Sequence, residues 1–157
     1  MILTTHALTG AVIGKNIDSP WLIIILSLAV HYFMDSFHHG EYFDDRIANI
    51  KNTWWKVAID LSAGLSIIGT IIYFQEPDFT VIRNMLIGTF FSLFPDSLSV
   101  LYYLKKDNVI LSRIKKFHAW VHNYSKLPRH SKGRQWTLRN ALNDITISLI
   151  AIFLLLL

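Results

Sequence analysis

The chain has 157 residues, of which 52% are apolar, only 17% are charged and none is cysteine. This composition excludes a disordered chain, and the missing cysteine excludes disulfides, zinc fingers and cysteine nucleophiles. The net charge is +4, and nine of the 15 Lys and Arg residues lie between Lys105 and Arg134. In so apolar a chain, a basic segment is more typical of the cytoplasmic side of a membrane protein than of a nucleic-acid site, so no nucleic-acid partner is expected.

The sequence predicts six helices and no strands, because the apolar runs are too long for strands and do not alternate. Four helices are long enough to cross a membrane, one is a short N-terminal helix, and one is basic and amphipathic. The long helices are expected over 20–39, 54–75, 80–104 and 136–157, the short helix over 1–14, and the amphipathic helix over 109–124. We therefore expect one all-α domain over residues 1–157, an integral membrane helical bundle whose amphipathic helix is interfacial.

Capping residues and prolines indicate where these helices begin and end. Ser19 and Pro20 suit the first positions of the helix over 20–39, and Gly40 suits its end. Pro77 separates the third helix from the fourth, and Pro95 predicts a kink or a break inside the fourth.

Ionisable side chains interrupt the apolar helices at one level. The positive-inside rule places the basic segment 105–135 in the cytoplasm, and alternation then places the N-terminus and residues 40–53 on the same side. With a rise of about 1.5 Å per residue, the His and Asp side chains of the helices fall within roughly 12 Å of that face. A charge inside a membrane costs about 2.5–3.5 kcal/mol on insertion scales, so several at one level indicate a shared ligand such as a metal ion.

The first candidate ligands are His31, Asp35 and His39, whose i, i+4, i+8 spacing places them on one helix face. His38 falls close to the same stripe and stays an alternative to His39. His and carboxylate ligands suit zinc, with manganese or iron as alternatives, and the number of candidates predicts two or more divalent ions. The alternative interpretation is a helix end that enters the polar headgroup layer.

Two further candidate ligands are carboxylates inside apolar helices. Asp60 is a candidate because of its depth, and its alternative is a hydrogen bond to neighbouring Ser or Thr hydroxyls. Asp96 follows Pro95, which frees backbone groups locally, and its alternative is to cap the restarted helix. Asp144 is interpreted mainly as a structural partner of Arg139.

The remaining candidates are histidines and one glutamate. His118 and His122 form an i, i+4 pair, which is also common for polar residues on a basic helix. His6 is a lone histidine at the same depth, and is otherwise a structural residue. Glu41 is a candidate general base for a metal-activated water, and is otherwise a loop residue.

The order of short motifs resembles one family. TTHALTGAVIG is followed by HYFMDSFHHGE, by an Asp in the third helix, by FPDSL and by FHAWVH. This series is similar to the bacterial membrane-bound metal-dependent hydrolases, which include inner-membrane proteins under SOS-repressor control and are distantly similar to zinc-dependent phospholipase C. The resemblance implies a His/Asp metal site with the ligands His6, His31, Asp35, His39, Asp60, Asp96 and His118. One departure is that SLSVLYYL follows Asp96, without the second Asp and the His that many relatives carry there.

We predict from these features a metal-dependent hydrolase of the inner membrane with its site towards the cytoplasm. The expected reaction is phosphoester cleavage on a lipid or lipid-linked phosphate, because the site lies at headgroup depth near Arg113, Lys115 and Lys116. Membrane lipids are the expected partners. The alternative is a divalent-metal transporter or sensor without enzymatic activity, although apolar outer helix halves such as LIIIL at 22–26 count against a transport path. A soluble helical bundle similar to the secreted phospholipases is disfavoured by the long apolar runs.

Overall fold

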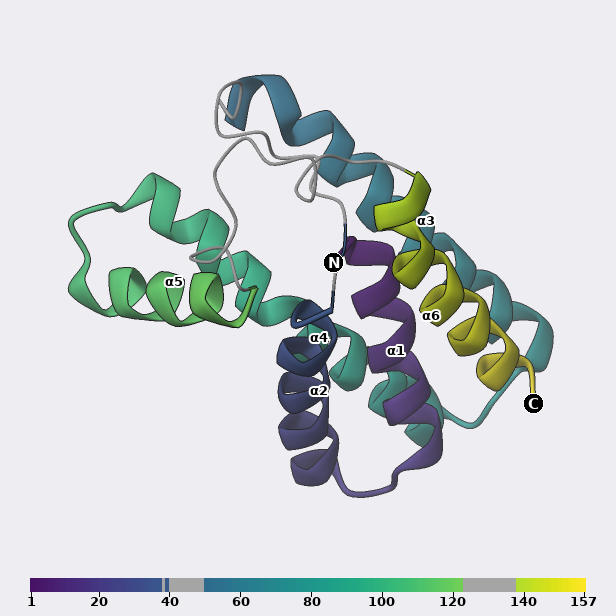
Figure 1. Cartoon of the computed structure of the whole chain (residues 1–157). Coiled ribbons are helices and arrows are strands. Elements are labelled where there is room, and N and C mark those ends of the chain that lie inside the picture. The colour runs from purple at the N-terminus through teal and green to yellow at the C-terminus, as the bar shows by residue number, and fades with distance from the viewer. Residues whose placement is uncertain (38, 40–49, 123–137) are drawn as a thin grey trace.

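The computed structural model describes residues 1–37, 39, 50–122 and 138–157 (Figure 1). Over these residues the chain forms six helices and no strand, which confirms the all-α prediction. The helices are α1 (Leu3–Asn16), α2 (Pro20–Asp35), α3 (Ile50–Gln75), α4 (Phe79–Leu104), α5 (Val109–Val121) and α6 (Leu138–Leu156).

Two helices of the described chain, not the predicted four, are long and apolar enough to cross a membrane. They are Trp54–Gln75 within α3 and Phe79–Leu104, which is α4. Only 17% of the most apolar window of α3 is buried within the chain, whereas the core helix of a soluble protein is mostly buried. The other two helices do not reach a spanning length within the described residues, where their apolar stretches are Pro20–Asp35 and Ala141–Leu156. A helix of this length spans about 24 Å at about 1.5 Å per residue, less than a hydrocarbon core of about 30 Å.

Most helix boundaries follow the expected sequence signals. Pro20 lies in the first turn of α2 behind Ser19, and Pro77 separates α3 from α4. Asn108 caps α5, because its side-chain oxygen accepts hydrogen bonds from two backbone N–H groups of the first turn at 3.0 Å. α4 continues as one helix through Pro95 although proline has no N–H to donate, so the chain does not break there.

The end of α2 differs from the prediction, because the helix stops at Asp35 and not at His39. The hydroxyl group of Ser36 donates a hydrogen bond to the carbonyl oxygen of Phe33 at 2.6 Å. Such local bonds from serine compete with continued helix. His39 therefore lies outside the helix, where it is nevertheless buried.

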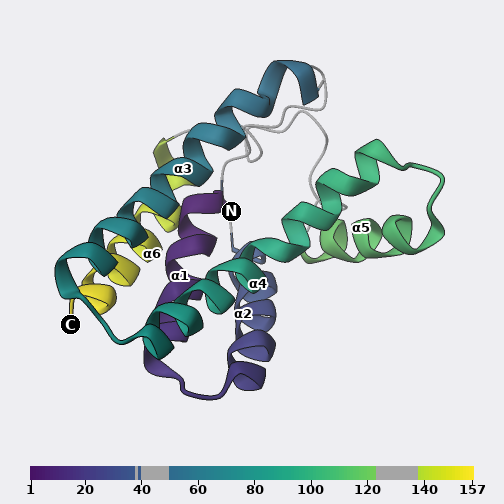
Figure 2. The same ribbon diagram turned by 180° about the vertical axis from the view of Figure 1, so that it is seen from behind.

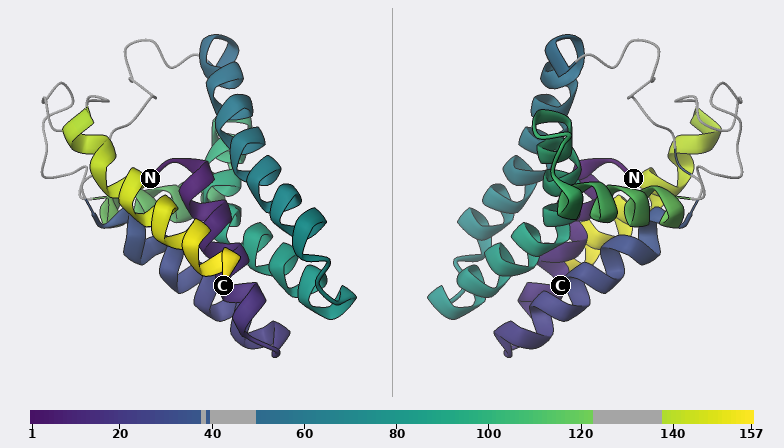
Figure 3. Two further views of the ribbon diagram at one scale, coloured as in Figure 1. Left: turned by 90° about the vertical axis from the view of Figure 1, so that its right-hand side faces the viewer. Right: turned by 90° about the vertical axis from the view of Figure 1, so that its left-hand side faces the viewer.

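α1 lies between the other helices and contacts α2, α3, α4 and α6 (Figure 1 and Figure 3). Its crossing with α4 is close because glycines replace side chains there. A Cβ atom on Gly10 would overlap with the carbonyl oxygen of Gly88, and one on Gly14 would overlap with the backbone of Asn84. The apolar core around this crossing consists of Ala7, Leu8, Ala11, Ile68, Ile71, Met85, Ala151 and Leu155.

α5 lies to one side of the bundle. It runs back beside the C-terminal part of α4, and the two form a helical hairpin that extends away from α1, α3 and α6 (Figure 1 and Figure 2). The C-terminal end of α5 returns towards the end of α2, which it contacts. This path brings two histidines of α5 to the last turn of α2.

Candidate metal centre

The centre of the candidate site is Asp35, a fully buried carboxylate in the last turn of α2. Its Oδ2 atom lies 2.9 Å from Nε2 of His118, 2.8 Å from Nε2 of His122 and 3.0 Å from Nε2 of His31. Its Oδ1 atom lies 3.1 Å from Nε2 of His6, and the amino group of Met1 lies 2.9 Å from the same oxygen. Imidazoles from α1, α2 and the end of α5 therefore converge on one carboxylate.

Two groups of ligand atoms share Asp35. The first group is His31, Asp35, Asp96 and His118, and the second is Asp35, His39 and His122. Within each group one possible ligand atom per residue lies within 4.8 Å of all the others. Imidazole and carboxylate ligands suit zinc and other first-row divalent ions, so the donor set fits a metal centre.

The tautomer of His31 is set by the backbone of α4. Nδ1 of His31 lies 2.6 Å from the carbonyl oxygen of Ser92, and because a carbonyl only accepts, Nδ1 carries the proton. In the neutral ring, Nε2 then has a lone pair, and this atom makes no hydrogen bond within the described residues. It nevertheless lies 3.0 Å from Oδ2 of Asp35, which is also an acceptor. Two facing acceptors repel each other unless a second proton or a cation lies between them.

His39 and His118 are oriented by similar outer contacts. Nδ1 of His39 lies 2.8 Å from the carbonyl oxygen of Phe37, so its Nε2 also has a lone pair in the neutral ring. Nδ1 of His118 lies 2.9 Å from the hydroxyl of Ser99, which leaves Nε2 towards the carboxylates. A partner on the second ring nitrogen is the usual way that proteins orient metal-binding histidines.

Burial keeps the second group of histidines neutral. It lowers the pKa of His39 to about 2 and that of His122 to about 4. Both imidazoles are therefore unprotonated at neutral pH, and only the unprotonated ring binds a metal ion.

Asp96 is the most accessible ligand of the first group. Its side chain is 26% exposed, whereas the side chains of Asp35 and His31 are fully buried. Oδ1 of Asp96 lies 3.6 Å from Nε2 of His118, so this carboxylate is at the partly exposed edge of the cluster.

Asp60 belongs to α3, and its carboxylate contacts the start of α1. It is in neither ligand group. Its carboxylate accepts hydrogen bonds from the backbone nitrogens of Leu3, at 2.6 Å, and Thr4, at 3.1 Å, and from the Thr4 hydroxyl. The bond to the Thr4 hydroxyl agrees with the alternative interpretation of Asp60. In addition, this carboxylate of α3 caps the first turn of α1. Asp144 acts in the same way, because its Oδ1 accepts from the backbone nitrogen of Ile2 at 2.9 Å.

Of the predicted site residues that the structure describes, all but Asp60 lie together. Asp60 lies at the cap of α1, and Glu41 and the alternative ligand His38 lie outside the described residues. Sequence analysis missed Ser99 and the carbonyl group of Ser92, which orient two of the histidines. Their spacing was the available signal: Ser99 lies three residues after Asp96 and Ser92 four residues before it, so all three share one helix face. The residues brought together are His6, His31, Asp35, His39, Asp96, His118 and His122.

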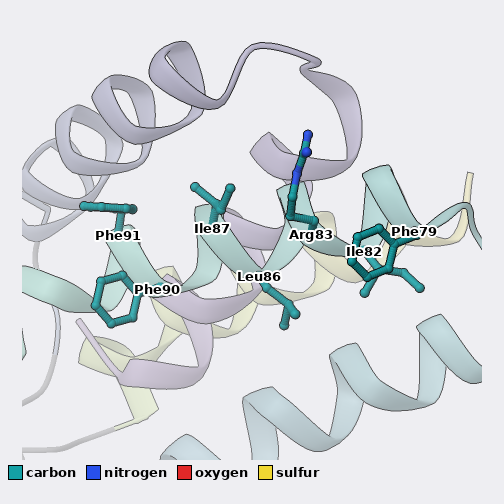
Figure 4. A pocket seen from close by; sticks show the side chains of 7 residues that line it. All are labelled: Phe79, Ile82, Arg83, Leu86, Ile87, Phe90 and Phe91. Atoms are coloured by element: carbon teal, nitrogen blue, oxygen red, sulfur yellow. The ribbon is translucent and has the colours of Figure 1, made fainter.

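A separate concavity of about 340 Å³ lies on the N-terminal half of α4 (Figure 4). It is lined by residues of α4 alone, from Phe79 to Phe91, and Arg83 is its only charged lining residue. It contains no ligand-bearing carboxylate or imidazole, so it is distinct from the cluster around Asp35.

No protein-family model, no curated protein and no solved structure matches this chain. The resemblance to membrane-bound metal-dependent hydrolases therefore stays a prediction from the motifs.

Proposed function

We propose that this protein is a membrane-embedded, metal-dependent hydrolase that cleaves a phosphoester in a lipid or a lipid-linked phosphate. The observation that carries the proposal is the pair of ligand groups that share Asp35, with Nε2 of His31 3.0 Å from its Oδ2. Seven buried or partly buried His and Asp side chains at one point have a high free-energy cost in an apolar bundle unless a cation compensates for it.

In the proposed enzyme, the residues of the two groups would hold zinc or a similar divalent ion. When bound, such ions supply Lewis-acid activation of water and of a phosphoryl oxygen. The carbonyl group of Ser92 keeps His31 in the metal-binding tautomer, and the hydroxyl group of Ser99 orients the ring of His118. The accessible carboxylate of Asp96 lies where water and substrate approach.

The proposed location is the inner membrane, with several helices crossing and the site towards the cytoplasm. The support consists of the two helices able to cross, the basic segment 105–135, and large exposed apolar side chains on several helices, among them Ile25, Phe74, Phe90 and Phe153. An exposed apolar surface of this kind is typical of contact with lipid. α5 then lies in the membrane interface, with the shorter α2 and α6 packed against the spanning pair.

The test is elemental analysis of the detergent-purified protein beside the double variant His31→Ala/Asp35→Ala. We expect two equivalents of zinc or manganese in the natural protein and none in the variant, together with release of diacylglycerol or phosphate from phospholipid micelles by the natural protein alone. A folded natural protein that binds no metal ion would overturn the proposal.

A metal transporter or sensor is the second candidate, and the near-complete burial of the cluster favours it. The most exposed side chain of the first group is that of Asp96, at 26%. A cluster with so little exposure suits storage or sensing of an ion. Zinc uptake into proteoliposomes, without hydrolysis of any phosphoester, would place this function first.

A further inference from the structure

α5 has two faces of different chemistry. The outward face combines basic with apolar side chains, and its apolar members Val109, Ile110 and Trp120 are 65%, 69% and 67% exposed. Arg113 and Lys116 are exposed on the same face, since helical spacing of three and four residues links them to Val109 and Trp120. The helix contains no acidic residue, so this face is complementary to an anionic surface.

The inward face of the same helix carries ligands. His118 and His122 lie one turn apart, and their Nε2 atoms lie 2.9 Å and 2.8 Å from Oδ2 of Asp35. Each ligand group receives one of them, His118 in the first and His122 in the second. Both groups are therefore incomplete unless α5 is in place.

Within the part of the chain that the structure describes, α5 makes few contacts away from α4. Phe117 packs against Tyr32 of α2 with ring centroids 5.1 Å apart, and His118 makes its contacts with Ser99 and the carboxylates. The remainder of the hairpin extends away from the bundle (Figure 2). A surface that holds the outward face would therefore also fix the two histidines.

We propose that the outward face of α5 docks on anionic lipid headgroups, and that this docking holds His118 and His122 at Asp35, so that anionic lipid tightens metal binding. The inference rests on the proposed metal site. A lipid interface fits the face better than a nucleic acid, because the aliphatic and indole side chains enter the acyl boundary while the basic groups stay with the headgroups. Coupling of this kind makes the enzyme active where its phospholipid substrate is present.

The test compares zinc affinity in nanodiscs of phosphatidylcholine alone and of phosphatidylcholine with phosphatidylglycerol. We expect zinc to bind the natural protein on the order of tenfold more tightly in the anionic discs, a typical size for coupling between two sites. The variant Arg113→Gln/Lys116→Gln should lose this difference. The matched variant Lys56→Gln/Arg139→Gln removes the same charge from α3 and α6 and should keep it.

A second measurement reports docking itself. Because the chain has no cysteine, Ile110→Cys gives one labelling site on the outward face for an environment-sensitive fluorophore. We expect its emission to shift to the blue in anionic discs only. No shift, or a shift produced by an RNA oligonucleotide and not by anionic lipid, would overturn the docking.

The outcomes separate the two proposals. Equal zinc affinity in both discs, with zinc bound, would overturn the lipid coupling and leave the metal centre intact. Loss of the lipid effect in both charge variants would assign it to net charge and overturn the role of α5. Absence of zinc in both discs would overturn the metal centre, and with it the coupling.

Discussion

Nε2 of His31 lies 3.0 Å from Oδ2 of Asp35, while Nδ1 of the same ring donates to the carbonyl oxygen of Ser92 at 2.6 Å. The carbonyl group fixes the tautomer, so the neutral ring directs a lone pair at a carboxylate oxygen. A cation held by both atoms would replace this repulsion with attraction. The chemistry of the site is thus set by a backbone atom of α4, the helix that also supplies Asp96.

Replacement of the shared carboxylate should abolish metal binding. Asp35→Asn keeps the size of the side chain but removes the charge and one acceptor oxygen. We expect metal affinity to fall by at least the factor of about 10–100 seen for lost outer partners, and both ions to be lost together. Elemental analysis and calorimetric titration measure this. Asp107→Asn, at an exposed carboxylate in the turn before α5, is the control and should bind normally. A variant Asp35→Asn that keeps two ions would contradict the assignment.

Loss of the hydroxyl that orients His118 should weaken the first ligand group. Ser99→Ala removes the partner of Nδ1, which lies 2.9 Å away, without touching any ligand atom. We expect metal affinity to fall by about 10–100-fold with little change in the melting temperature. Ser97→Ala is the matched control, because the Ser97 hydroxyl is exposed and bonds only to the carbonyl of Leu93. Equal affinity of the two variants would show that Ser99 does not position the ligand.

The sequence predicted much of the fold and of the cluster, because both depend on local spacing. The i, i+4 pairs His31–Asp35 and His118–His122 and the prolines at helix ends follow from helix geometry alone. Alternation of the helices then predicted that ligands from different segments lie at one level. The structure brings His6, His31, Asp35 and His118 together accordingly.

The remaining features depend on tertiary contacts that no periodicity encodes. Asp60 has the depth of a ligand, but it caps α1 because the start of that helix packs against α3. The end of α2 was placed too late because the bond from Ser36 to Phe33 is decided by local geometry. Two apolar residues of α5, Ile110 and Phe117, are 69% and 48% exposed, so apolar character alone does not identify the inward face of this helix. Which side of an amphipathic helix faces the bundle depends on where the hairpin turns.

The role of Asp60 is open to a direct test. Asp60→Asn keeps one acceptor oxygen but removes the charge at the start of α1, where three donors from Leu3 and Thr4 meet the carboxylate. We expect a loss of roughly 0.5–2 kcal/mol in the free energy of unfolding, as for other helix caps, with the metal content unchanged. Thermal unfolding followed by circular dichroism and elemental analysis measure both. Loss of metal from a variant of natural stability would restore Asp60 to the ligand set.

The close crossing of α1 and α4 should tolerate no side chain at Gly88. The Cβ atom of Gly88→Ala would overlap with the carbonyl oxygen of Gly10, so the helices must separate. We expect a loss of about 1–3 kcal/mol, as for other overpacked cores, and weaker metal binding because α1 carries His6. Gly69→Ala on α3 is the control, since nothing lies within 4 Å of its added Cβ atom. A variant Gly88→Ala as stable as the natural protein would contradict this packing.

The stability of the metal-free protein should depend on pH through His39 and His122. Burial lowers their pKa values from 6.5 to about 2 and about 4, so between pH 4 and 6.5 the unfolded chain binds protons that the folded chain does not. Stability therefore falls as the pH drops below 6.5 and levels off above 6.5. Denaturant unfolding of the chelator-treated protein at a series of pH values measures this slope. The variant His39→Gln/His122→Gln should make the slope shallower but not remove it, because burial also lowers the pKa of His6. An unchanged slope would show that other groups control the acid sensitivity.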